Sequence, residues 1–161
     1  MSLIEKRLKD LGVVLPEPVA PVANYVPYVI SGNLLFVAGQ IPLVAGKPLA
    51  LGQLGAGVSI EQGAACAHQC AINVIAQIKA ACEGDLDRVK RIVKLVCFVS
   101  AAPHFVQVPM VANGASDLMV AVFGDIGRHA RSSVGCSTLP LDVPVEVEAI
   151  VEIDNAFHPA A

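Results

Sequence analysis

HARSSVGCSTLPLDVPVEVEAI, residues 129–150, is the stretch that decides most about the fold and the chemistry of this chain. It begins as a strand of small residues around Arg131, passes a proline-bearing turn at residues 139–142, and continues as a strand that alternates valine with glutamate. Arginine holds a carboxylate well through two parallel hydrogen bonds, and glutamate commonly handles a proton or a water beside it. The stretch therefore suggests a small substrate that carries a carboxylate.

The two strands of this stretch predict a hairpin. If the chain reverses around residues 139–142, Arg131 lies near Ile150, with Glu148 as a diagonal neighbour and Glu146 farther along the strand. Spacing alone favours a simpler interpretation, in which Arg131 and a glutamate form an exposed cross-strand ion pair that contributes little. At this point both interpretations remain open.

Composition limits the classes of protein to consider. The chain has 161 residues, which fits one domain, and 55% of them are hydrophobic while only 16% are charged. The apolar excess predicts subunit interfaces, and hence an oligomer. The net charge of −3 disfavours nucleic acid as a partner. No apolar run is long enough to span a membrane, and the first residues mix charges without a secretory core, so a cytoplasmic protein is expected.

Five cysteines raise the question of a metal site. Cys66 and Cys70 would share one face of a helix, whereas His68 between them would point roughly the opposite way. Three ligands cannot converge from there, so we expect buried cysteines, a surface histidine and no metal. Glycines 52, 55 and 57 precede a helix but lack the spacing of a nucleotide-binding loop.

Hydrophobic periodicity and turn residues predict the remaining elements. In chain order these are a short helix over 3–11, a proline-rich extended arm over 15–21, a hairpin of strands 25–31 and 34–38, a loop over 43–58 with at most one short strand, a helix over 59–82 that opens with a capping box, a strand over 90–101 and a helix over 108–123. This order predicts an α+β fold, with a mostly antiparallel sheet and two helices on one face. The other face, if apolar, needs a partner chain.

The residues quoted so far resemble the Rid/YjgF family of reactive imine and enamine deaminases. That family ends in an Ala-Arg-Ser strand, a Leu-Pro turn and an alternating strand that closes with Ala-Ile, as residues 130–132, 139–140 and 145–150 do here. The fifteen positions from Arg131 to Glu146 fit the family's interval from arginine to glutamate. Upstream, residues 32–42 (GNLLFVAGQIP) are similar to the family's Gly-Asn and Gly-Gln-Ile-Pro segment, and Tyr25 stands where the family has a pocket tyrosine.

The resemblance implies a chorismate-mutase-like (ferredoxin-like) domain that forms a homotrimer with ligand pockets between subunits. It also implies a hydrolase similar to 2-iminobutanoate/2-iminopropanoate deaminases. Such an enzyme adds water to a 2-imino acid and releases ammonia and a 2-keto acid. No cofactor is expected, because the substrate is already reactive and needs only binding, orientation and a proton.

Roles carry over from the resemblance position by position. Arg131 would clamp the substrate carboxylate and Glu146 would hold the attacking water. Tyr25 would line the pocket, the backbone of Gly39 would approach the ligand, and Asn113 would match the family's pocket asparagine. Ser133, also expected to bind substrate, replaces a family cysteine, and Ala38 replaces a family serine. These two departures predict that the pocket wall differs from that of well-studied family members.

The family-like domain is expected over residues 24–154. Residues 1–23 add an N-terminal helix and a proline-rich arm, and residues 155–161 form a tail. The arm could close the cleft or bind a neighbouring subunit, although ordinary packing is the simpler role. Two other functions stay open: a non-catalytic binder or sensor of small carboxylate metabolites, and the endoribonuclease or translation-inhibitor role given to family members. The acidic charge and scarcity of aromatic residues disfavour the latter.

Overall fold

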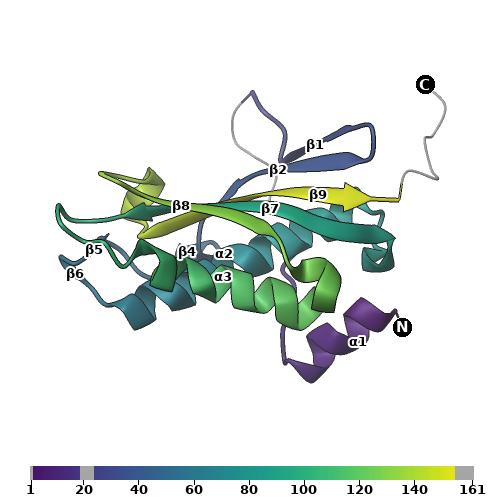
Figure 1. The fold of residues 1–161 in the computed structure, drawn as a ribbon, viewed down its shortest axis with the longest axis horizontal. Helices are drawn as coiled ribbons and strands as arrows, with labels where there is room; N and C mark the ends of the chain where they lie inside the picture. Colours follow the sequence, from purple (N-terminus) through teal and green to yellow (C-terminus); the bar gives the residue numbers. More distant parts are fainter. Residues whose placement is uncertain (1, 19–23, 155–161) are drawn as a thin grey trace.

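The protein folds into a sheet covered on one face by helices. A computed structural model describes residues 2–18 and 24–154. The two main helices, α2 (Ile60–Ala81) and α3 (Val108–Phe123), lie side by side on the same face of a five-stranded sheet (Figure 1). The predicted α+β architecture with helices on one face is confirmed.

The strand order of the sheet is β1-β2-β9-β7-β8. Its strands are β1 (Tyr28–Ser31), β2 (Leu34–Gln40), β7 (Val89–Ser100), β8 (Ala130–Cys136) and β9 (Val145–Ile153). All neighbours pair antiparallel except β7 and β8, which are parallel. The sheet is therefore mostly antiparallel, as predicted, with one parallel strand at its edge.

The predicted hairpin of the last two strands is wrong. β7 lies between β8 and β9 and pairs with both of them. The connection over residues 137–144 contains a 3-10 turn, η3 (Pro140–Asp142), and crosses the end of β7, where the Ser100 amide donates to the Pro144 carbonyl at 2.9 Å. This connection is too long for a tight turn, and a parallel β8 reached through α3 leaves β9 free to pair on the other side of β7.

The ends of the helices follow local signals in the sequence. Ser59 and Gln62 form the predicted capping box at the start of α2, each side chain bonding to the other's backbone amide. Pro109 stands in the first turn of α3, where its missing amide hydrogen has no cost. Gly124 ends α3 with a φ of +67°, which glycine adopts easily. A short 3-10 turn, η2 (Gly124–Gly127), then leads to β8.

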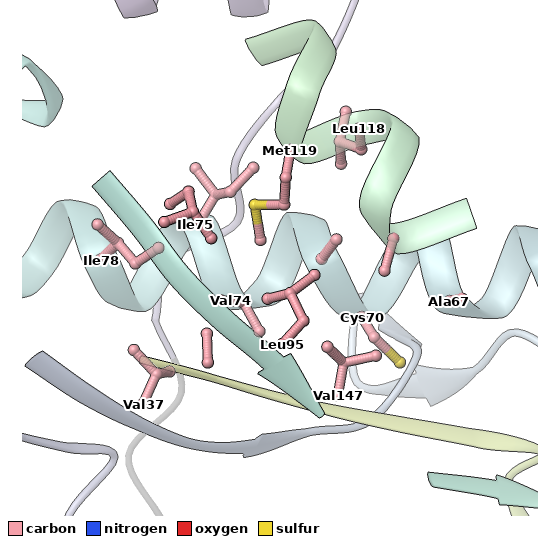
Figure 2. Packing of buried hydrophobic residues seen from close by; sticks show 14 of the residues in the cluster. Val37, Ala67, Cys70, Val74, Ile75, Ile78, Leu95, Leu118, Met119 and Val147 are labelled. Carbon is pink, nitrogen blue, oxygen red and sulfur yellow. The ribbon is translucent and has the colours of Figure 1, made fainter. Parts of the chain in front are cut away.

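The core lies between the sheet and these two helices (Figure 2). Alternate residues of β9 are buried against α2, and Val74, Ile75 and Met119 fill the space between the helices and Leu95 of β7. Cys66 and Cys70 are fully buried in this layer, whereas His68 is exposed. Burial of such small apolar groups is worth roughly 25 cal/mol per Å² of area removed from water.

Residues 43–58 differ from the predicted loop. They form two small sheets: β3 (Leu43–Val44) pairs antiparallel with β4 (Lys47–Pro48), and β5 (Gln53–Leu54) pairs parallel with β6 (Gly57–Val58). Each strand has two residues, too few to produce a hydrophobic period that could be recognised in the sequence.

The N-terminal segment packs on the helix layer. Helix α1 (Leu3–Asp10) buries Ile4 and Leu8, and its Arg7 donates to the Val122 carbonyl of α3 at 3.3 Å. The carboxylate of Asp87, in the 3-10 turn η1 (Leu86–Arg88), accepts from the first two amides of α1. The predicted arm runs as irregular chain as far as Pro18; its remainder lies outside the described residues.

The opposite face of the sheet carries apolar side chains that none of the described helices covers. The strand register places Val29, Phe36 and Ile150 in one row across this open face, and Val134 and Phe98 in another. Val29, Phe36 and Val134 are exposed. A bulge between Ile92 and Lys94 turns Ile92 toward the helices, whereas Val96 and Phe98 farther along β7 face the other way.

Candidate functional site

Arg131 stands on the edge strand β8 and faces the helix layer. It pairs with Leu95 of β7, which is fully buried under the helices, so the parallel register turns the guanidinium toward α3. Because β8 has a neighbour only on one side, Arg131 is half-buried rather than enclosed.

Two polar side chains of α3 hold this guanidinium. Arg131 Nη1 donates to Asn113 Oδ1 at 2.9 Å and to Ser116 Oγ at 3.1 Å, and Nη2 has a longer contact of 3.5 Å with the Pro109 carbonyl. Ser133 lies two residues along β8 on the same face as Arg131. Arg131, Asn113 and Ser133 therefore lie on the same side of the sheet; we call these three residues the clamp group.

Glu146 stands on the other face of the sheet. It pairs with Phe98, and the alternation along β9 turns Glu146 and Glu148 to the open face while the valines between them are buried. Burial raises the pKa of the Glu146 carboxyl above its ordinary value, and the nearby charge of Glu148 raises it further. A carboxylate with a raised pKa accepts a proton more readily than an ordinary one.

The carboxyl of Glu146 lies against Gly39. A Cβ on Gly39 would overlap Glu146 Oε1, so the absence of a side chain at position 39 makes room for the acid. Gly39 and Tyr25 also line a cavity of about 510 Å³ at the end of β2, and Tyr25 is 59% exposed. We call Tyr25, Gly39 and Glu146 the acid group.

The clamp group and the acid group do not meet within one chain. Two strand spacings, or about 10 Å, separate β8 from β9 across β7, and the two groups project from opposite faces. The expectation that Arg131 lies near Ile150 with Glu148 as a diagonal neighbour is wrong for this reason. The cross-strand ion pair is wrong too: among residues 2–18 and 24–154, Arg131 forms no salt bridge and instead bonds to α3.

Comparison with known proteins places this geometry in a family. The family model described as "YjgF/chorismate mutase-like, putative endoribonuclease" matches residues 5–153. The chain belongs to this family.

Known relatives cover nearly all of the chain. Protein TCP17 of Trypanosoma cruzi is 49% identical over 153 residues, which is 94% of this chain and 95% of that protein. The solved structure of Atu1372, a protein of unknown function from Agrobacterium tumefaciens, is 49% identical with a TM-score of 0.89 over 94% of this chain and 92% of its own. The structure of Escherichia coli TdcF with bound serine shares the fold at 22% identity, with a TM-score of 0.60 over 84% of this chain and 93% of its own.

Two polar residues of this YjgF-family chain escaped sequence reasoning. Ser116 follows Asn113 by three positions, a spacing that places both on one helix face, and this signal could have found it. Nothing in the sequence links His129 to Ser116, yet its ring lies 2.9 Å from Ser116 Oγ. The contact depends on the turn η2, which brings the chain back along α3.

Burial makes cysteine thiols of this family member unreactive. Burial raises the pKa values of Cys66 and Cys97 to about 11, so neither thiol ionises readily at neutral pH. In the described part of the chain, no group of three or more His, Cys, Asp or Glu side chains could hold a metal ion. Nor does any described helix have the length and apolar character to cross a membrane.

Proposed function

We propose that the protein hydrolyses small 2-imino or enamine acids to 2-keto acids and ammonia, at a site shared by two copies of the chain. The observation that carries this proposal is the separation of the clamp group from the acid group. The clamp group supplies an arginine that can bind a carboxylate, and the acid group supplies a carboxyl that can take up a proton. One small substrate cannot reach both groups within a single chain.

A homotrimer would bring the two halves together. The open face of the sheet exposes Val29, Phe36 and Val134, an apolar surface in need of a partner. A ring of copies packed through this face would place the edge strand β8 of one copy near β9 of the next. The substrate cleft would then lie between Arg131 of one copy and Glu146 of its neighbour.

The chemistry assigns one role to each polar group. The Arg131 guanidinium binds the α-carboxylate and so fixes the imine carbon in the cleft. Glu146 takes one proton from a water, whose oxygen bonds to the C=N carbon while the C=N π bond breaks and solvent protonates the nitrogen, which gives a carbinolamine. Glu146 then returns its proton to the amino group and the hydroxyl loses its proton to solvent, so that the C–N bond breaks, ammonia leaves and the C=O of a 2-keto acid forms. These steps need no cofactor.

The relatives agree with a carboxylate ligand. TdcF, which shares this fold, has been described with bound serine, whose α-carboxylate is the group that we assign to Arg131. A non-catalytic binder of such metabolites would use the same clamp without Glu146. The raised pKa of Glu146 favours catalysis over binding alone, because a group that only binds an anion gains nothing from a nearby acid.

A coupled assay tests the proposal. An amino-acid oxidase generates the imine in situ, and release of the keto acid is followed with wild type, Arg131→Ala and Glu146→Gln. We expect wild type to accelerate release and each variant to lose roughly 100-fold of that acceleration. No acceleration by wild type, together with pyruvate binding that depends on Arg131, would establish the binder instead. RNA cleavage that survives loss of Arg131 would support the endoribonuclease role.

A further inference from the structure

A continuous chain of hydrogen bonds leads from the backbone to the Arg131 guanidinium. His129 Nδ1 lies 2.6 Å from the Gly127 carbonyl oxygen, and His129 Nε2 lies 2.9 Å from Ser116 Oγ. Ser116 Oγ in turn lies 3.1 Å from Arg131 Nη1. This series of hydrogen bonds joins four residues from three segments of the protein and ends at Nη1 of Arg131.

The donor and the acceptor in each of these hydrogen bonds can be assigned. A carbonyl only accepts, so His129 Nδ1 carries a hydrogen and donates it to Gly127. A guanidinium only donates, so Ser116 Oγ accepts from Arg131. The Ser116 hydroxyl hydrogen is then best donated to His129 Nε2, which must be bare to accept it.

The backbone around His129 holds it firmly in this position. A Cβ on Gly127 would overlap the Met119 carbonyl of α3, so the turn η2 packs directly against that helix. The Arg128 amide closes the turn by donating to the Asp125 carbonyl at 3.2 Å. The imidazole is therefore fixed between the turn and Ser116, on the helix that also carries Asn113.

These bonds engage one end of the guanidinium and leave an edge available. Asn113 and Ser116 take both hydrogens of Nη1, and the Pro109 carbonyl is the acceptor nearest to Nη2. All three acceptors belong to α3. In the described chain, Nε has no hydrogen-bond partner. The Nε–H and the adjacent Nη2–H form a parallel pair that matches the two oxygens of a carboxylate.

We propose that Ser116 and His129 are positioning residues: they hold Arg131 so that its Nε–Nη2 edge points away from α3 and receives a carboxylate. The identity of the bound group rests on the proposed function, whereas the orientation of the guanidinium does not. A histidine that only stabilised the turn η2 would leave the rotation of the guanidinium unaffected, and this difference makes the proposal testable.

Nitrogen NMR of the labelled full-length chain tests the orientation without any ligand. We expect His129 in the Nδ1–H form and separate Nη signals for Arg131, because its hydrogen bonds slow rotation of the guanidinium. Ser116→Ala and His129→Ala should broaden or merge these signals, and Ser116→Thr, which keeps the hydroxyl, should preserve them. An Nε2–H form of His129, or Arg131 signals that neither alanine variant changes, would overturn the proposal.

Pyruvate binding then tests the consequence. Ser116→Ala and His129→Ala should each weaken pyruvate binding about tenfold, the factor for one ordinary hydrogen bond, and the double variant should be no weaker than Ser116→Ala alone. The exposed His68→Ala serves as the matched control and should bind as wild type does. Equal binding by wild type and both alanine variants would overturn the positioning role. If wild type bound no pyruvate while the NMR differences appeared, the proposed function would fail and the positioning would stand.

Discussion

The carboxyl group of Glu146 occupies the space beside Gly39 that a side chain at position 39 would fill. This contact joins β9 to the end of β2, within the irregular pairing between Val37 and Gln40. It fixes the acid at the end of the strand that leads into the cavity lined by Tyr25. Position 39 therefore controls where the acid lies.

Gly39→Ala should lower deaminase activity sharply while leaving the fold intact. The new methyl group would displace the flexible end of the Glu146 side chain, which can rotate away at little energetic cost, but the carboxyl would leave the position that we propose for catalysis. We expect at least a roughly tenfold loss of kcat/KM, since small displacements of reacting groups are costly, with little change in the unfolding temperature.

Gly135→Ala is the matched control, because a Cβ there would meet Ala101 and Val108 at ordinary contact distances of 3.8 and 3.9 Å. It should leave activity unchanged. Full activity of Gly39→Ala in the same assay would show that the position of Glu146 does not matter.

The stability of the protein should depend on pH through Glu146. Its pKa is raised in the folded chain, by burial first and by Glu148 second, so the folded state holds this proton more tightly than the unfolded state. The free energy of unfolding therefore loses a contribution as pH rises from the ordinary carboxyl value of 4.5 through the raised one. Glu146→Gln, which cannot ionise, should be more stable than wild type at pH 7, and the difference should vanish below pH 4.5. Urea denaturation at several pH values measures the difference in stability between Glu146→Gln and wild type. A difference that does not change with pH would contradict a raised pKa of Glu146.

Gly114→Ala should destabilise the fold. A Cβ at this position would overlap the backbone carbonyl of Ala64, so α2 and α3 are in direct contact here. Forcing them apart should lower the free energy of unfolding by about 1–3 kcal/mol. Asp117→Ala, an exposed change on the same helix, is the control for denaturant unfolding and should have little effect. Equal stability of Gly114→Ala and wild type would mean that α2 and α3 leave room for a methyl group at position 114.

Asp87→Ala should loosen helix α1. The Asp87 carboxylate accepts from the amides of Leu3 and Ile4, both at 3.2 Å, and its loss leaves the helix start without these acceptors. We expect a loss of about 1 kcal/mol, the usual effect of removing a helix cap, and faster hydrogen exchange over α1. Asp87→Asn keeps one acceptor oxygen, so its stability should lie between that of wild type and that of Asp87→Ala. Unchanged exchange in Asp87→Ala would show that packing against α3 alone holds α1.

Local signals in the sequence predicted the elements well. The span of α3, the capping box of α2 and the two-residue turn at Gly32 and Asn33 all agree with the structure. These features depend on residues close together in the chain, such as Ser59 and Gln62, which bond to each other whatever the rest of the fold does.

Strand partners could not be predicted in the same way. The alternation of Val145 to Ile150 shows that one face of β9 is buried, but it is the same whether β7 or β8 lies beside that strand. For this reason Arg131 and Glu146 were expected on neighbouring strands, whereas β7 separates them. The family pattern paired the two residues in sequence without indicating that they project from opposite faces of the sheet.

Mixing two inactive variants tests the shared site most directly. Arg131→Ala retains the acid group and Glu146→Gln retains the clamp group, so the trimer that we propose, when it contains both variants, would have one cleft with two intact halves. After unfolding and refolding together in equal amounts, the mixture should recover about a quarter of the wild-type deaminase activity, since that share of clefts combines the two intact halves. Activity no higher than that of the separately refolded variants would contradict a site formed between copies of the chain.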